Sequence, residues 1–146
     1  TIFLLTMPSG TELLILMVLA VALADIGAYF VGRRWGRHKL AIRVSPGKTW
    51  EGFFGGVASV VSLTLIIAYV LPQQMSHLSL VTLVLLGLAV AGASVLGDLT
   101  VSMVKRESGV KDSGTLLPGH GGLLDRIDGL CAAAPVFGLG LLLAGY

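Results

Sequence analysis

The sequence has few charged residues, one cysteine and no asparagine. Asp, Glu, Lys and Arg together make up 12% of its 146 residues, whereas an ordinary soluble domain carries about 25%. Such a sparse supply of charge excludes a water-facing globular surface. Cys131 has no second thiol with which to form an internal disulfide, and without asparagine there is no acceptor for N-glycosylation.

Apolar residues are instead gathered in four long runs. They cover about residues 13–32, 52–71, 78–97 and 130–146. A helix needs roughly 20 apolar residues to cross the hydrocarbon layer of a membrane. The fourth run is the shortest, so its helix is expected to begin inside the preceding polar segment. The pattern predicts an all-α fold, a polytopic transmembrane helical bundle with about four membrane-spanning helices plus cytoplasmic loop or helix segments.

The three loops between these runs differ in charge. The second loop has no Lys or Arg, whereas the first and third are rich in them, with Arg33, Arg34, Arg37, Lys39, Arg43 and Lys48 in one and Lys105, Arg106, Lys111 and Arg126 in the other. Because cytoplasmic loops are enriched in Lys and Arg, the first and third loops are predicted to face the cytoplasm. Residues 1–146 are expected to form a single membrane-embedded catalytic domain, the C-terminal part of a longer chain, because Thr1 already lies in an apolar stretch.

The third loop contains acidic residues at helix ends and several cations. Asp98, Ser102 and Lys105 share one face of a helix if the third run continues beyond the membrane. Asp125 and Asp128 are three residues apart and also share a face. The glycine-rich turn between the two groups, which contains Gly119, Gly121 and Gly122, can bring backbone N–H groups close to a phosphate.

These residue types suit metal-assisted phosphoryl or nucleotidyl transfer. Carboxylates from two helix ends can hold Mg²⁺, which prefers oxygen ligands, and Lys or Arg can neutralise the phosphates. The alternative is a purely structural role, in which the Asp residues cap helices and the cations set topology. It is plausible for any one residue, but it explains the whole cluster poorly.

The first two runs add a smaller set of candidates. Asp25 lies inside an apolar run, where a carboxylate is costly and is therefore a functional candidate, with a structural hydrogen bond as the alternative. Lys48 is a candidate phosphate contact. Its neighbours resemble the end of a P-loop, but Ile42 stands in place of the first glycine, so a Walker motif is rejected. Trp50 is interpreted as an interfacial anchor.

The stretch from Ser102 to Asp128 resembles the defining motif of the phosphatidate cytidylyltransferases, also called CDP-diglyceride synthases. The matching positions are Ser102, Lys105, Arg106, Lys111, Asp112, Pro118, Gly119, His120, Gly121, Gly122, Asp125, Arg126, Ile127 and Asp128. Residues 45–52 also resemble a family segment, with Gly47 where Lys is more usual. The resemblance covers nearly the whole chain from about Leu13 onward.

The resemblance implies a nucleotidyltransferase of bacterial inner-membrane phospholipid biosynthesis. It would convert CTP and phosphatidic acid into CDP-diacylglycerol and pyrophosphate, with Mg²⁺ as cofactor and the active site facing the cytoplasm. Catalytic roles are implied for Asp98, Asp125, Asp128, Lys105 and Arg106, the three Asp residues as metal ligands. Substrate-binding roles are assigned to Asp25, Lys48, Ser102, Lys111, Asp112, His120, Gly121, Gly122 and Arg126.

The expected partners are CTP, phosphatidic acid and the lipid bilayer, with no nucleic acid. A second cation and a homodimer are both left open by the sequence. Two other functions remain as alternatives. A polyprenol or phytol kinase would handle CTP similarly but transfer its γ-phosphoryl group. A transporter built on Asp25 and Asp98 is disfavoured because the charges cluster at one membrane face.

Overall fold

Four helices and one short hairpin make up the computed structural model, which describes residues 10–70, 79–110 and 124–145. The helices are α2 (Gly10–Trp35), α3 (Trp50–Val70), α4 (Leu80–Glu107) and α5 (Leu124–Leu143), and the strands are β1 (Lys39–Ala41) and β2 (Ser45–Thr49). Helices α2, α3 and α4 are long and apolar enough to cross a membrane, and α5 contains a shorter apolar helix over Ile127–Leu143. The predicted all-α bundle is therefore confirmed.

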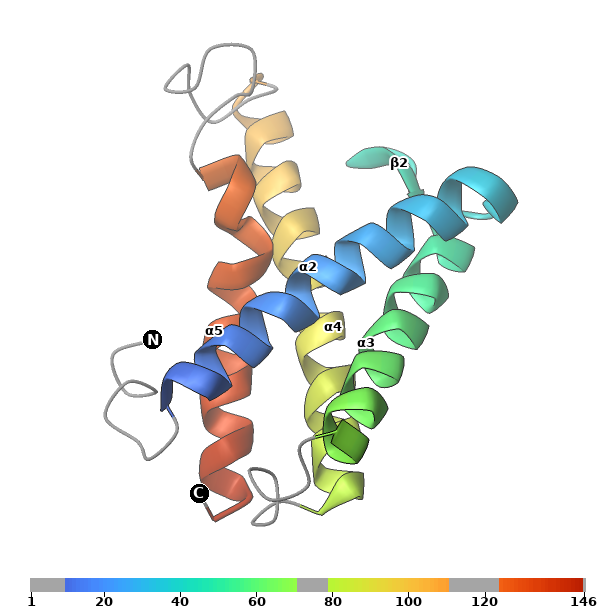
Figure 1. The fold of residues 1–146 in the computed structure, drawn as a ribbon. Helices are drawn as coiled ribbons and strands as arrows, with labels where there is room; N and C mark the ends of the chain where they lie inside the picture. Colours follow the sequence, from blue (N-terminus) through green and yellow to red (C-terminus); the bar gives the residue numbers. More distant parts are fainter. Residues whose placement is uncertain (1–9, 71–78, 111–123, 146) are drawn as a thin grey trace.

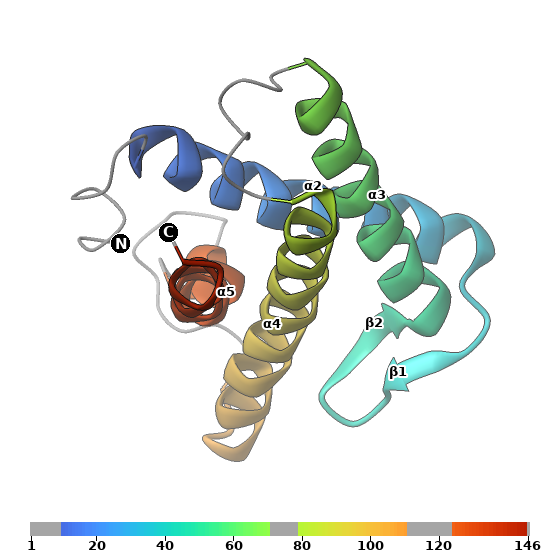
Figure 2. The same cartoon turned by 90° about the horizontal axis from the view of Figure 1, so that it is seen from below.

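The helices form two antiparallel pairs. Helix α2 packs along α3, α4 packs along α5, and α3 joins the pairs through α4. Figure 1 shows α2 crossing the bundle obliquely, while the C-terminal ends of α2 and α4 and the N-terminal ends of α3 and α5 lie toward the same end. Figure 2 shows the hairpin beside the start of α3. The core between the pairs is apolar and consists of Leu13, Met17, Ala20, Val21, Ala24, Val60, Leu83, Leu86, Val90, Ala91, Ala133, Phe137 and Leu141.

Helix α4 extends ten residues beyond the predicted third apolar run. At its start the Ser79 hydroxyl accepts the backbone N–H of Thr82 at 3.1 Å, which satisfies one of the free donors of the first turn. At its end Gly109 has a φ of 72°, a left-handed conformation that favours glycine and ends helices. The extension carries Ser102 and Lys105 on the helix, as expected, so the motif begins on a rigid element.

The first polar loop contains an antiparallel hairpin that the sequence did not predict. Lys39 pairs with Thr49 and Ala41 with Ser45. The buried Thr49 hydroxyl then accepts the backbone N–H of Gly52 at 3.1 Å and so caps the start of α3. Contrary to the expectation that no strand precedes Gly47-Lys48-Thr49, β1 lies before this segment and Lys48 itself lies in β2. The rejection of a Walker motif therefore rests on Ile42 in place of the first glycine.

Candidate active site

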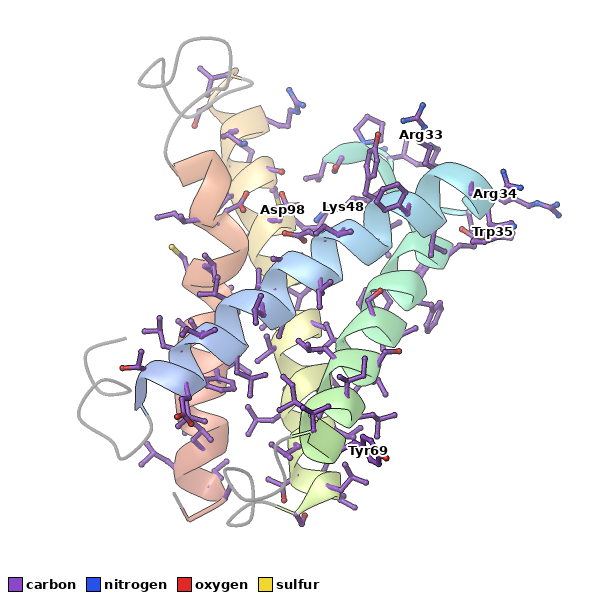
Figure 3. All side chains as sticks on the ribbon, viewed as in Figure 1. Arg33, Arg34, Trp35, Lys48, Tyr69 and Asp98 are labelled. Carbon is purple, nitrogen blue, oxygen red and sulfur yellow. The ribbon has the colours of Figure 1, made fainter. Side chains whose placement is uncertain are left out.

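Asp98 is the centre of a polar cluster between α4 and the hairpin. Its Oδ2 forms an ion pair with the Lys48 ammonium, and its Oδ1 accepts a hydrogen bond from the Ser102 hydroxyl at 3.2 Å. Ser102 lies one turn further along α4, which is the relation that the i, i+4 spacing predicted. Figure 3 shows the Lys48 and Asp98 side chains close together in the middle of the polar end. The structure therefore brings Lys48, a candidate from the first loop, together with Asp98 and Ser102, which were predicted to share one helix face.

Asp128 lies near this cluster because α4 and α5 approach closely at a glycine. A Cβ atom at Gly97 would be 2.8 Å from the carbonyl oxygen of Asp128 and 2.5 Å from the Cβ of Ala132, so only glycine fits there. The Asp128 carboxylate accepts the backbone N–H of Gly129 at 2.7 Å. The crossing therefore brings the backbone beside Asp98 against the backbone of Asp128.

Asp125 belongs to the same end of the bundle. Its backbone lies in the first turn of α5, whose N-terminal end faces the C-terminal end of α4. Asp125 and Asp128 are three positions apart, which corresponds to about 4.5 Å along a helix axis. The backbones of Asp98 and Asp125 therefore both lie toward the charged end of the bundle, whereas their roles in metal binding stay a prediction.

A cavity of about 690 Å³ opens beside Asp98. Its walls come from the C-terminal half of α2, the hairpin, the start of α3 and the part of α4 around Asp98. Asp25 also lines this cavity, and the charges of Lys48, Asp98 and Asp128 all act on it. Asp25 lies ten residues before the end of α2, which is about 15 Å along the axis. The cavity lining therefore extends from the charged end of the bundle to Asp25, which lies within the predicted first apolar run.

The cavity adds residues that we did not predict as part of the site. Tyr29, Arg33 and Lys39 all line it. A signal for two of them is present in the sequence, because Asp25, Tyr29 and Arg33 follow one another at intervals of four and so share one helix face. The sequence alone predicts that Arg33, like Arg34 and Arg37, sets topology and attracts anionic lipid head groups.

Several predicted site residues lie outside the part of the chain that the structure describes. These are Lys111, Asp112, His120, Gly121 and Gly122, together with the side chains of Asp125 and Arg126. Lys105 and Arg106 are described and belong to the last turn of α4, where cations complement the helix dipole. The charge of Lys105 acts on Asp128. The predicted cationic end of α4 thus adjoins the acidic cluster.

The donor atoms of this cluster suit a hard cation. Carboxylate and hydroxyl oxygens from Asp98, Ser102 and Asp128 are ligands of the kind that Mg²⁺ prefers. Within residues 10–70, 79–110 and 127–145, no group of three His, Cys, Asp or Glu side chains is already gathered closely enough to hold a metal ion. A third carboxylate ligand would therefore have to come from Asp125 or from a rearrangement of the cluster.

Known proteins share extensive sequence with this chain. A model of the cytidylyltransferase family matches residues 2–143. A phosphatidate cytidylyltransferase of Haemophilus influenzae is 50% identical over 129 residues, which cover 88% of this chain and 45% of that protein. One of Pseudomonas aeruginosa is 50% identical over 140 residues, which cover 95% of this chain and 51% of that protein. The chain thus spans about half the length of these curated relatives.

One solved structure has the same fold. It is described as an intramembrane enzyme for archaeal membrane lipids biosynthesis and superimposes with a TM-score of 0.57 at 22% identity, over 87% of this chain and 77% of that one. The long apolar helices and the relatives together identify an integral membrane protein. Because the family match extends over nearly all of its residues, the chain belongs to the cytidylyltransferase family.

Proposed function

We propose that the protein carrying this chain is a phosphatidate cytidylyltransferase, a nucleotidyltransferase that forms CDP-diacylglycerol and pyrophosphate from phosphatidic acid and CTP. The observation that carries the proposal is the cluster of Asp98, Lys48 and Ser102 beside a cavity whose lining extends into the first apolar run. A water-soluble nucleotide and a membrane lipid can meet only at such a boundary. The 50% identity to two phosphatidate cytidylyltransferases supports the same reaction.

The proposed reaction is a direct displacement at the α-phosphorus of CTP. A phosphate oxygen of phosphatidic acid forms the new P–O bond, and the bond to the β-phosphate breaks, so that pyrophosphate leaves with its electron pair. No general base is needed because the nucleophile is already an anion. The main barrier is repulsion between two polyanions, so cations near the reacting phosphates contribute most to the rate.

Different residues of the site have different proposed roles in this reaction. Lys48, Lys105 and Arg106 offer positive charge to the phosphates, and we assign Ser102, Lys111, Asp112, His120, Gly121, Gly122 and Arg126 to substrate binding. We also assign Asp25, which lines the cavity, to substrate binding. Asp98, Asp128 and Asp125 would hold Mg²⁺, which when bound neutralises phosphate charge and aligns the attacking and leaving oxygens. Asp98 is held in place by Lys48 and Ser102 before any cation binds.

The orientation of the site also belongs to this proposal. The ends of α2 and α4 carry Arg33, Arg34, Lys105 and Arg106 in their last turns, and cytoplasmic ends are enriched in such residues. We assign this end to the cytoplasm, where CTP is found. Residues 1–146 would then form the membrane-embedded catalytic part of the protein.

The test is a product analysis with the full-length protein in detergent–lipid micelles. CTP labelled in its γ-phosphate should release labelled pyrophosphate only when phosphatidic acid is present. CTP labelled in its α-phosphate should yield a labelled lipid. Release of CDP would instead indicate a kinase, and nucleotide consumption that does not depend on phosphatidic acid would contradict the proposed reaction.

A further inference from the structure

Arg33 is held over the cavity by a tyrosine on the preceding turn of α2. Its Nη1 donates a hydrogen bond to the Tyr29 hydroxyl at 2.8 Å, and its guanidinium carbon lies 5.9 Å from the centre of the Tyr29 ring. Both residues line the cavity that also contains Asp25 and Asp98. A long and flexible side chain is thus restrained at the cavity wall, although much of it remains exposed.

The charges around the cavity leave Arg33 available for an anion. The cavity is lined by three cations, Arg33, Lys39 and Lys48, and Lys48 is already paired with Asp98. In the described part of the chain, neither Arg33 nor Lys39 has a carboxylate within ion-pairing distance. The cavity also contains two carboxylates, Asp25 on the same helix as Arg33 and Asp98, which is paired with Lys48. Three cations against two carboxylates leave the lining with a net positive charge, which favours an anionic ligand.

Arg34, the next residue in the sequence, can be compared directly with Arg33. Arg34 lies over the ring of Trp35 at 5.8 Å and does not line the cavity. Figure 3 shows Arg33 and Arg34 extending from the same end of α2. The two residues contribute equally to a topology signal and to the helix dipole. Only Arg33 has a tyrosine hydroxyl partner and a place at the cavity, which a topology signal alone does not require.

The level of Arg33 along the helix suits a phosphate at the membrane boundary. Exposed aromatic rings surround this end of the bundle, with Trp35 61%, Trp50 48% and Phe54 62% exposed. Belts of exposed Trp and other aromatic residues mark the level of lipid head groups. The guanidinium fork can bind two phosphate oxygens at once, and a planar, always charged group is well suited to that contact.

We propose that Arg33, positioned by Tyr29, binds a phosphate group of one of the two substrates and is a specificity-determining residue of this site. This inference rests on the proposed function, since it names a contact within the same reaction. The ligand chemistry is a phosphate anion, supplied either by the phosphomonoester of the lipid or by the triphosphate of CTP. The experiments below distinguish these two sources.

The first experiment compares Arg33→Gln with Arg34→Gln in the full-length protein. The KM of each substrate is measured while the other is saturating. Loss of a charge-assisted, bidentate contact should raise one KM roughly tenfold or more, whereas Arg34→Gln should leave both KM values near those of the unaltered protein. A rise in the KM of phosphatidic acid assigns the contact to the lipid, and a rise in that of CTP assigns it to the nucleotide. Equal behaviour of the two variants would overturn the proposal.

Tyr29→Phe tests the positioning part of the inference. It removes the hydroxyl that accepts the hydrogen bond from Arg33 but keeps the ring. The KM that rises in Arg33→Gln should therefore rise by a smaller factor in Tyr29→Phe, with kcat nearly unchanged. Tyr69→Phe is the matched control, because Tyr69 is 88% exposed at the opposite end of α3. A Tyr29→Phe variant whose KM values match those of Tyr69→Phe would remove the positioning role.

The second experiment does not depend on turnover. Thermal stabilisation of the full-length protein is measured with dioleoyl phosphatidic acid, with dioleoylglycerol, which lacks the phosphate, and with CTP. The ligand that stabilises through its phosphate should lose that effect in Arg33→Gln and keep it in Arg34→Gln. Stabilisation that Arg33→Gln leaves intact would contradict the phosphate contact. If the protein binds phosphatidic acid through Arg33 but forms no CDP-diacylglycerol, the proposed function fails while the phosphate site stands.

Discussion

At the scale of single residues, Asp98 connects α4 to the hairpin. It faces the hairpin through Lys48 and the next turn of its own helix through Ser102. We expect Asp98→Asn to reduce turnover to near background, because the amide cannot replace a carboxylate as a cation ligand. Pyrophosphate release should be measured beside Glu107→Gln, which removes an exposed carboxylate from the end of the same helix. Substantial activity in Asp98→Asn would remove the metal-binding assignment of this residue.

The ion pair between Lys48 and Asp98 makes a separate prediction about cation binding. The two side chains are 25% and 34% exposed, and a partly exposed pair is worth about 0.2–1 kcal/mol. A divalent cation at Asp98 must compete with the Lys48 ammonium, so Lys48→Met should strengthen Mn²⁺ binding by up to about fivefold.

Mn²⁺ binding is measured by electron paramagnetic resonance on the full-length protein without substrates. Arg43→Met, which alters a cation at the hairpin turn outside the cavity, is the control. Weaker Mn²⁺ binding in Lys48→Met would mean that the lysine supports the cation site instead of competing with it.

At the scale of elements, the crossing of α4 and α5 determines how closely the acidic residues approach. Gly97→Ala would place a methyl group 2.5 Å from the Cβ of Ala132 and should cost about 1–3 kcal/mol through overpacking. It should also lower activity, because it separates Asp98 from Asp128. Gly92→Ala is the matched control in the same helix, since a Cβ there meets nothing within 4 Å and alanine favours helix by roughly 0.5–1 kcal/mol.

Thermal unfolding and pyrophosphate release should be followed together for these two variants. We expect Gly97→Ala to unfold at a lower temperature than the unaltered protein, and Gly92→Ala to unfold at the same or a higher temperature. A Gly97→Ala variant with unchanged stability and activity would show that the helices can separate locally without cost, and that the close crossing does not set the geometry of the site.

Besides the Thr49 cap, a contact between Glu51 and His38 holds the hairpin to the start of α3. The Glu51 carboxylate lies 2.6 Å from the His38 ring nitrogen and also accepts the His38 backbone N–H at 3.2 Å. Because Lys48 lies on this hairpin, Glu51→Gln should loosen its placement and raise the KM of at least one substrate severalfold. Hydrogen exchange at the Trp50 amide, which donates to the His38 carbonyl at 2.9 Å, should become faster.

Glu12→Gln is the control for this change, since Glu12 is an exposed acid in the first turn of α2, far from the hairpin along the helix. Faster exchange at Trp50 accompanied by unchanged KM values would show that the clamp stabilises the hairpin without contributing to the site.

Whether an element can be predicted from the sequence depends on how far apart in the chain its contacting residues lie. The four helices are encoded by apolar runs of about membrane length, and the Asp98–Ser102 contact follows from local helical spacing. The hairpin pairs Lys39 with Thr49, and His38 is joined to Glu51 of α3; neither contact follows from an apolar run or from helical spacing. The place of Arg33 at the cavity depends on how α2 packs against α3 and the hairpin, so its charge alone indicates only topology and an attraction for anionic lipid head groups.

At the scale of the whole molecule, charge is segregated along the bundle. The ends of α2 and α4 carry the basic residues of their helices, whereas the last turn of α3 and the last turn of α5 contain none. A membrane potential and the anionic inner leaflet both favour placing the basic end in the cytoplasm. In the proposed orientation, this asymmetry would place Asp98 on the side of the membrane that holds the proposed substrate CTP.

This orientation predicts the outcome of labelling with a membrane-impermeant maleimide. In a background where the exposed Cys131 is replaced by Ala, Arg43→Cys at the hairpin turn should react only in inverted membrane vesicles. Ser79→Cys, just before α4, should react only in right-side-out vesicles, because α4 carries the chain from one end of the bundle to the other. Reaction of both positions from the same side would mean that α4 does not cross the bilayer. A pattern reversed between the two vesicle types would place Asp98 on the side without CTP, and the proposed reaction would then lack its nucleotide.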